Sequence, residues 1–188
     1  MGGRDDYLAL FHEGGHAEHY AAVDPVARFE ERRLGDNAIT EAFAFLLEGL
    51  VERDEPSARA RRRFYLRRYA GKLLYELDLH DGEGGLAAHA PGYAVALGAA
   101  TGVPWPRETY LEDVDPAFYV ACYLRAWALE ARLRGALQER FGEDWRNRAA
   151  AGTWLRALWR RGQAPDPDEL ADELDGNGPL RFETALVG

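Results

Sequence analysis

The stretch that decides the fold is "LALFHEGGHAEHY", residues 8–20, which places two histidines four positions apart. Residues i and i+4 of a helix lie one turn apart on the same face, so His12 and His16 can direct their imidazole nitrogens at one metal ion. A catalytic zinc site uses three protein ligands and leaves a position for water. Glu13 lies beside the pair, where it can act as a general base. The stretch therefore predicts a helix that carries two of three zinc ligands.

Composition bounds the class of protein. The chain has 188 residues, of which 47% are hydrophobic, so it can bury a core, and we expect a single domain over residues 1–188. Its formal charge of -9 argues against nucleic acid or an anionic membrane as the main partner, because both repel an acidic protein. The sequence contains neither a signal-peptide pattern nor an apolar run long enough to span a membrane. A cytoplasmic protein is therefore expected.

Helical periodicity dominates the sequence and predicts a mainly α, multi-helical fold. The first helix should stop before Pro25, because the residue that precedes a proline resists helical dihedral angles. Asp36 or Asn37 can cap the next helix. Further along, Asp115 and Pro116 have the order of a cap and a first-turn residue, so a long helix should start there.

The third zinc ligand is predicted on the second of these helices. Its sequence "AITEAFAFLLEGLVER", residues 38–53, carries Glu41 within an otherwise apolar part. The return between the two helices is short and would make them antiparallel. An unpaired buried carboxylate is costly, and coordination would remove that cost. Glu41 is thus the best candidate to complete a Zn²⁺ site with His12 and His16.

At this point the residues resemble a known family. "LALFHEGGHAEHY" followed by "GDNAITEAFAFLLE" is similar to the active-site helices of the thimet oligopeptidase and oligoendopeptidase F family of zinc metallopeptidases. That family has the pattern H-E-x-G-H and a ligand glutamate on the next helix, and Glu41 lies 25 positions after His16, as in the family. Gly15 and His19 also match. The resemblance implies a zincin-like catalytic domain with an antiparallel glutamate-ligand helix, whereas Gly14 departs from the family and suggests close packing by another segment.

A second segment extends the resemblance. "FYVACYLRAWALEARL", residues 118–133, is similar to the family's FYV-x-x-Y helix. By that match, Tyr123 takes the place of a tyrosine that hydrogen-bonds the oxyanion, and Tyr119 that of a neighbouring active-site tyrosine, although an aromatic residue on such a helix is as often part of a core. The family usually has a histidine before this segment and this chain has acidic residues there. His80 and His89 are possible substitutes, or ordinary loop histidines.

The chain also differs from the family in length. Family enzymes have a helical part before the zinc helix that forms the opposite wall of a substrate channel, whereas this chain begins near the zinc helix. It resembles the C-terminal catalytic half of a larger oligopeptidase. We therefore expect a homo-oligomer, or a partner chain that supplies the missing wall of the cleft.

The resemblance implies a zinc metallopeptidase that hydrolyses peptide bonds in short peptides, with Glu13 as general base. Two alternatives stay open. One is a protein that binds zinc but is catalytically incomplete. The other is a helical interaction module in which His12, Glu13 and His16 are surface residues without a metal. The sequence does not distinguish endopeptidase from carboxypeptidase action, and a related helical carboxypeptidase family shares the H-E-x-x-H and downstream glutamate arrangement.

Overall fold

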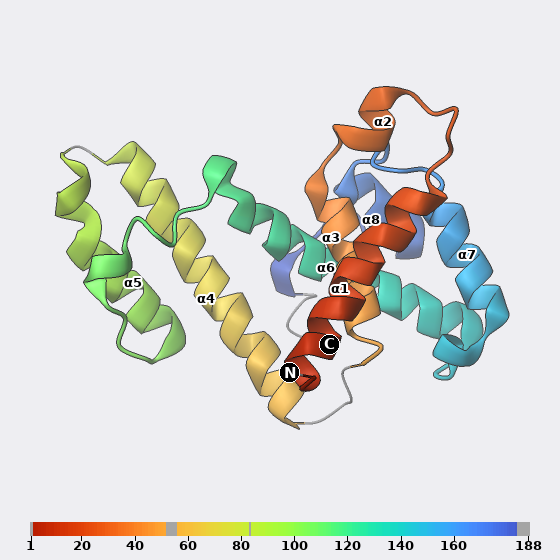
Figure 1. Cartoon of the computed structure of the whole chain (residues 1–188), viewed down its shortest axis with the longest axis horizontal. Coiled ribbons are helices and arrows are strands. Elements are labelled where there is room, and N and C mark those ends of the chain that lie inside the picture. Colours follow the sequence, from red (N-terminus) through yellow and green to blue (C-terminus); the bar gives the residue numbers. More distant parts are fainter. Residues whose placement is uncertain (1, 52–55, 83, 184–188) are drawn as a thin grey trace. The chain divides into compact units, whose positions relative to one another are not determined.

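The computed structural model describes residues 2–51, 56–82 and 84–183, and every regular element within these ranges is helical (Figure 1). The mainly α class predicted from the sequence is therefore confirmed. The α-helices are α1 (Arg4–Ala22), α2 (Phe29–Arg33), α3 (Asn37–Glu48), α4 (Pro56–Asp81), α5 (Ala90–Thr101), α6 (Tyr119–Phe141), α7 (Ala149–Trp159) and α8 (Pro167–Asp175). Short 3₁₀ helices are η1 (Leu86–His89), η2 (Arg107–Thr109), η3 (Pro116–Phe118) and η4 (Trp145–Asn147).

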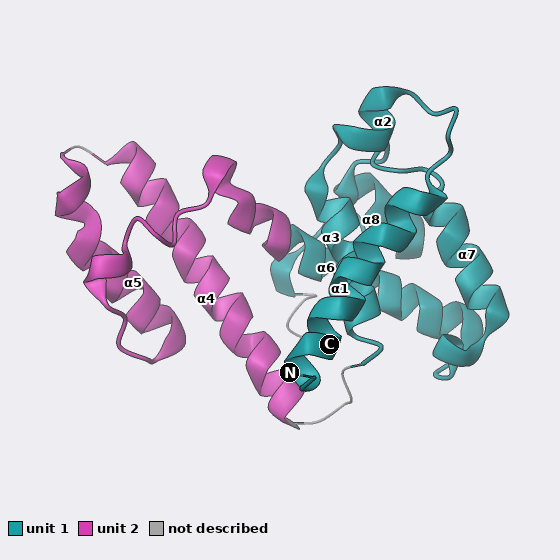
Figure 2. Cartoon of the chain, viewed as in Figure 1, with its two compact units in different colours: residues 1–55, 125–188 teal, residues 56–124 magenta. Residues whose placement is uncertain are grey.

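The chain divides into two compact units (Figure 2). Unit 1 comprises residues 1–55 and 125–188, and unit 2 comprises residues 56–124. Unit 1 contains α1, α3, α7, α8 and most of α6, whereas unit 2 contains α4, α5 and the first residues of α6. The single domain expected from the sequence stays a prediction.

The core of unit 1 is built around α3. Most residues of this helix are buried, as expected of a helix that is apolar on several sides. Apolar side chains from α3, α6, α7 and α8 pack together in this core, among them Ile39, Phe43, Leu129, Leu133, Leu155, Trp159 and Leu170. The core holds α3 in place, and α1 packs on it from another side (Figure 1).

Helix α1 meets α3 at a glycine. A Cβ atom added to Gly15 would lie 2.5 Å from the Cα of Ala44 and 2.9 Å from the carbonyl oxygen of Phe43, closer than any side chain fits. Gly14 differs, because an added Cβ would have no atom of the described residues within 4 Å. The prediction of close packing at Gly14 is therefore wrong. The close approach of α1 and α3 requires a glycine at position 15 instead.

Helix boundaries follow the sequence signals in unit 1. Helix α1 ends at Ala22, before Pro25 as predicted. Asp36 is the N-cap of α3, where its side chain accepts a hydrogen bond of 2.8 Å from the backbone N–H of Ala38. This bond satisfies a donor that the helix itself leaves without a partner. The cap thus fixes where the ligand helix begins.

The start of α6 is a correction. Asp115 precedes a 3₁₀ turn over Pro116–Phe118, and α6 begins only at Tyr119. Ala117 and Phe118 have φ values of 55° and 54°, in the left-handed region that non-glycine residues rarely adopt. The predicted start of a helix directly at Pro116 is therefore wrong, because two consecutive left-handed residues interrupt the helical path.

Unit 2 has a small core and a buried charged network. Its buried aromatic and aliphatic residues are Tyr75, Leu79, Tyr93 and Leu97. Close to this core, the Nζ of Lys72 lies 2.7 Å from a carboxylate oxygen of Asp115 and 3.7 Å from carboxylate oxygens of Glu76 and Asp113. Burial raises the pKa of Glu76. Because a buried charge is tolerated only when it is paired, this network attaches the segment before α6 to α4.

The two adjacent glycines of α1 give a matched test of the fold. We expect Gly14→Ala to raise the free energy of unfolding by about 1 kcal/mol, because alanine favours a helix more than glycine does. Gly15→Ala should lower it by about 1–3 kcal/mol, because its methyl group would push α1 away from α3. Urea unfolding followed by circular dichroism measures both values. Equal stability of the two variants would contradict the close approach.

Candidate metal centre

Three of the residues predicted as metal ligands lie together in unit 1. The Nε2 atom of His12 is 3.3 Å from the Oε2 of Glu41, and the Nε2 of His16 is 3.6 Å from the same oxygen. The ligand atoms of the three side chains all lie within 4.8 Å of one another. Two imidazole nitrogens and one carboxylate oxygen thus converge on one point.

Two side chains of α3 contact the Nδ1 atoms of the two imidazole rings. The Nδ1 of His12 is 3.1 Å from the Oε2 of Glu48, and the Nδ1 of His16 is 2.9 Å from the Oγ1 of Thr40. His12 therefore reaches the C-terminal end of α3 and His16 the N-terminal end, so the two helices are antiparallel. In both rings the Nδ1 is engaged, and the Nε2 faces Glu41.

Thr40 and Glu48 were not predicted from the sequence. Glu48 lies seven positions after Glu41, two helical turns further along the same face, and this spacing was a usable signal. Thr40 gave no signal, because a threonine beside an acidic residue occurs in many helices. The sequence thus identified the three residues that could hold a metal ion and missed the groups that contact the two imidazole rings.

Burial and the nearby carboxylates act in opposite directions on the two histidines of this cluster. Burial alone would lower the pKa of His12, but the hydrogen bonds and charges of Glu41 and Glu48 raise it to about 9. For His16, burial outweighs the attraction of Glu41, and its pKa is lowered. The Glu41 side chain is only 6% exposed. A positive charge is therefore stabilised at His12 and disfavoured at His16.

The donor set fits a divalent metal ion. Two histidines and one carboxylate form a ligand set found in catalytic zinc sites, and the mixture of nitrogen and oxygen donors also suits other divalent transition metals. In each histidine the Nε2 atom is available to a metal ion, and the Nδ1 atom contacts a side chain of α3 that orients the ring. This is the usual arrangement of metal-binding histidines. The cluster could therefore hold a metal ion through His12, His16 and Glu41.

Glu13 occupies a different position from the ligands. It follows His12 on α1, and its side chain is exposed rather than part of the ligand cluster. Its charge nevertheless acts on the ring of His16. Glu13 is therefore exposed and outside the group that could hold a metal ion.

The two tyrosines singled out from the sequence lie together in unit 2. The ring of Tyr123 stacks on that of Tyr69 with 5.5 Å between their centroids, and the edge of one ring meets the face of the other between Tyr119 and Tyr123 at 5.1 Å. All three side chains are partly exposed. Tyr69 was not predicted, and no sequence signal pointed to it.

The two candidate substitute histidines have separate surroundings, also in unit 2. His80 is exposed and its ring lies edge-on to Phe118, 5.1 Å between centroids. His89 is less exposed, and its Nδ1 lies 3.4 Å from a carboxylate oxygen of Asp78. His80 therefore adjoins the residue that precedes Tyr119, whereas His89 pairs with an acidic residue of α4.

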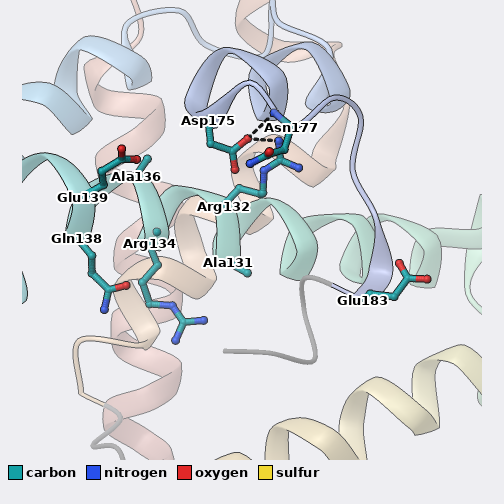
Figure 3. A pocket seen from close by; sticks show the side chains of 10 residues that line it. Ala131, Arg132, Arg134, Ala136, Gln138, Glu139, Asp175, Asn177 and Glu183 are labelled. Carbon is teal, nitrogen blue, oxygen red and sulfur yellow. Dashed lines mark hydrogen bonds and ion pairs between the residues drawn. The ribbon is translucent and has the colours of Figure 1, made fainter.

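An open pocket of about 740 Å³ lies elsewhere in unit 1, along α6 and the chain after α8. Figure 3 shows Arg132 turned toward Asp175 and Asn177 in this pocket. Its guanidinium donates to the carbonyl oxygens of Ala171 and Gly178, at 3.1 and 3.2 Å, and pairs with Asp175. The pocket contains none of the metal-cluster residues, and its buried charge serves to attach α8 to α6.

His19 is a buried histidine outside the cluster. It is fully buried, and its Nε2 lies 3.3 Å from the carbonyl oxygen of Gly162, to which it can donate a hydrogen bond. Its ring stacks on Tyr20 and packs against Phe43. Burial lowers its pKa to about 4. His19 is therefore a neutral core residue that joins α1 to the segment after α7.

Comparison of the chain with protein-family models, with curated proteins and with solved structures found no match. The resemblance to the oligopeptidase family therefore depends on the motif residues of this chain. None of the described helices combines the length and the apolar character that a bilayer crossing requires.

The low pKa of His19 predicts a loss of stability in acid. In the unfolded chain the pKa returns to about 6.5, so the unfolded state binds a proton between pH 6.5 and 4 that the folded state excludes. The free energy of unfolding should therefore fall by about 3 kcal/mol from pH 7.5 to pH 4 through this residue alone.

Urea unfolding in the presence of a chelator, at both pH values, measures the effect. His19→Gln should remove this share of the pH dependence, whereas His80→Gln, at an exposed site, should retain it. An unchanged pH dependence in His19→Gln would contradict the assignment of His19 as a neutral core residue.

Proposed function

We propose that this chain is a zinc-dependent metallopeptidase with a zincin-like catalytic domain, and that it hydrolyses peptide bonds in short peptides. The observation that carries the proposal is the convergence of His12, His16 and Glu41 on one point, with Glu13 next to His12 in the chain and its charge acting on His16. This constellation agrees with the H-E-x-G-H motif and the glutamate of the next helix in the oligopeptidase family.

His12, His16 and Glu41 would hold the metal. A bound zinc ion supplies Lewis acidity, which lowers the pKa of water and polarises a carbonyl group. Glu13 accepts the proton of the attacking water and delivers it to the leaving amine. The exposed position of Glu13 supports this role, because the base must reach both solvent and substrate.

We assign to Tyr123 the donation of a hydrogen bond to the oxyanion, and to Tyr119 a neighbouring place in the active site. The support is the resemblance of residues 118–133 to the family's tyrosine helix. The partial exposure of both phenol rings is compatible with contact to a substrate. Stacking on Tyr69 restricts the orientation of the Tyr123 ring.

We further propose that a second chain, another copy or a different protein, completes the surface that holds the peptide. Tyr7, Leu10 and Phe11 support this proposal, because these apolar residues of α1 are exposed close to the ligand histidines in the sequence. The cytoplasm remains the expected location.

Glu13→Gln separates metal binding from catalysis. The variant should retain one metal ion per chain, because Glu13 is not a ligand, and should cleave peptides about 10²–10⁴-fold more slowly, because the general base is lost. Metal analysis and a panel of fluorogenic peptides measure the two properties. Glu18→Gln, which removes a carboxylate from an exposed position of the same helix, should leave both unchanged.

The outcomes distinguish the proposal from its alternatives. Peptide cleavage that survives in Glu13→Gln would refute the assigned base. Bound zinc without any cleavage by the unaltered chain would favour the zinc-binding but incomplete protein. A chain that binds no metal and loses no stability in a chelator would be the helical interaction module.

Tyr123→Phe tests the proposed oxyanion donor. It should reduce kcat by about 10²–10³-fold with little change in KM or metal content, because one donor to the oxyanion is lost. Tyr65→Phe, at an exposed aromatic residue of α4, serves as a control and should leave kcat unchanged. Tyr119→Phe decides between the two interpretations of that residue, since a core aromatic residue would tolerate loss of the hydroxyl group.

A further inference from the structure

The ring of His12 is restrained on two sides. Its Nδ1 lies 3.1 Å from the Oε2 of Glu48, the last residue of α3. The ring also meets Phe45 edge-on, with 4.9 Å between centroids, and Phe45 in turn stacks on Trp127 at 5.0 Å. The aromatic contact restricts the tilt of the ring, and the carboxylate of Glu48 holds Nδ1 beside it, which leaves Nε2 directed at Glu41.

The two ligand histidines differ in the group behind them. His16 has the hydroxyl of Thr40, a neutral partner that can donate or accept a hydrogen bond. His12 has the carboxylate of Glu48, which when ionised only accepts. An imidazole that donates from Nδ1 to a carboxylate keeps its lone pair on Nε2, the atom that lies 3.3 Å from Glu41.

We propose that Glu48 is a positioning residue of the metal centre: it orients His12 through Nδ1 and supplies the second negative charge that balances a divalent cation. This inference rests on the proposed metal centre. Glu48 is not itself a ligand of the same ion, because it contacts the Nδ1 of His12, whereas Glu41 lies at the Nε2 of that ring.

The charge argument concerns the whole cluster. With both histidines neutral, Glu41 is the one carboxylate among the three candidate ligands, so a dication held by them would keep a net charge of +1 in a largely buried place, and such a charge is costly. Glu13 also acts on His16 but is exposed, whereas Glu48 contacts a ligand ring directly and brings the charge of the ion, Glu41 and Glu48 to zero. Its side chain is 28% exposed, so part of its charge is screened by solvent, and its contribution to affinity is smaller than that of a ligand.

The test is metal affinity, measured on the full chain without reference to catalysis. Zn²⁺ binding is determined by competition with a chromophoric chelator, and the absorption spectrum of the Co²⁺-loaded protein reports the ligand geometry. We expect Glu48→Ala to weaken Zn²⁺ binding about 10–100-fold, as is typical when a partner behind a ligand histidine is removed. Glu48→Gln keeps a hydrogen-bond acceptor without the charge and should show a smaller loss.

Two controls separate positioning from general effects. Glu18→Gln removes one negative charge from an exposed position of α1 and should bind Zn²⁺ as the unaltered chain does. The Co²⁺ spectrum should shift in Glu48→Ala only, because only that variant leaves the Nδ1 of His12 without its acceptor. A merely structural role of Glu48 would leave the spectrum unchanged.

Zn²⁺ affinity of Glu48→Ala within threefold of the unaltered chain, or a loss equal to that in Glu18→Gln, would overturn the inference. A chain that binds no Zn²⁺ at all would overturn both the metal centre and the role of Glu48. Tight Zn²⁺ binding without peptide cleavage, together with weaker binding in Glu48→Ala, would support the role of Glu48 and refute only the peptidase proposal.

Discussion

The backbone contact between α1 and α3 at Gly15 and Ala44 is the constraint on which the candidate site depends. Packed helices usually have axes 8–10 Å apart, with side chains filling the space between them. Gly15 has no side chain at this contact, so the two helices approach closely enough for His16 and Glu41 to converge. A wider separation would leave His16 and Glu41 too far apart to share an ion.

Helix α3 has two functions that make opposite demands on its sequence. One side must be apolar, because Ile39 and Phe43 pack into the core of unit 1. The side toward α1 carries polar groups, Thr40, Glu41 and Glu48, in a place where polar groups are costly unless they are paired. The helix satisfies both demands because the polar groups face the imidazole rings of α1, which provide partners for each of them.

The sequence was sufficient to predict that His12, His16 and Glu41 come together, and insufficient to predict their surroundings. The proximity of His12, His16 and Glu41 could be predicted because two histidines lie at helical spacing and Glu41 lies within the apolar part of the next helix. Glu48 was less evident, because its spacing of two helical turns from Glu41 was a signal but an acidic residue near a helix end is ordinary.

Backbone conformation limited the prediction in a different way. The mainly α class and the cap at Asp36 followed from periodicity and residue type. The left-handed residues Ala117 and Phe118 did not, because no residue type near Pro116 signals a positive φ angle. Gly15 matches the family's glycine and Gly14 does not, but only the position of α3 shows that a side chain is excluded at Gly15 and not at Gly14.

The role of Gly15 has a consequence for mutational mapping of this protein. Scans that replace each residue by alanine report what is lost when a side chain is shortened, and they usually pass over glycine. A position that must lack a side chain is detected only when a larger residue is introduced there. A library restricted to truncations would identify the histidines and glutamates of the cluster and would miss the residue that lets them meet.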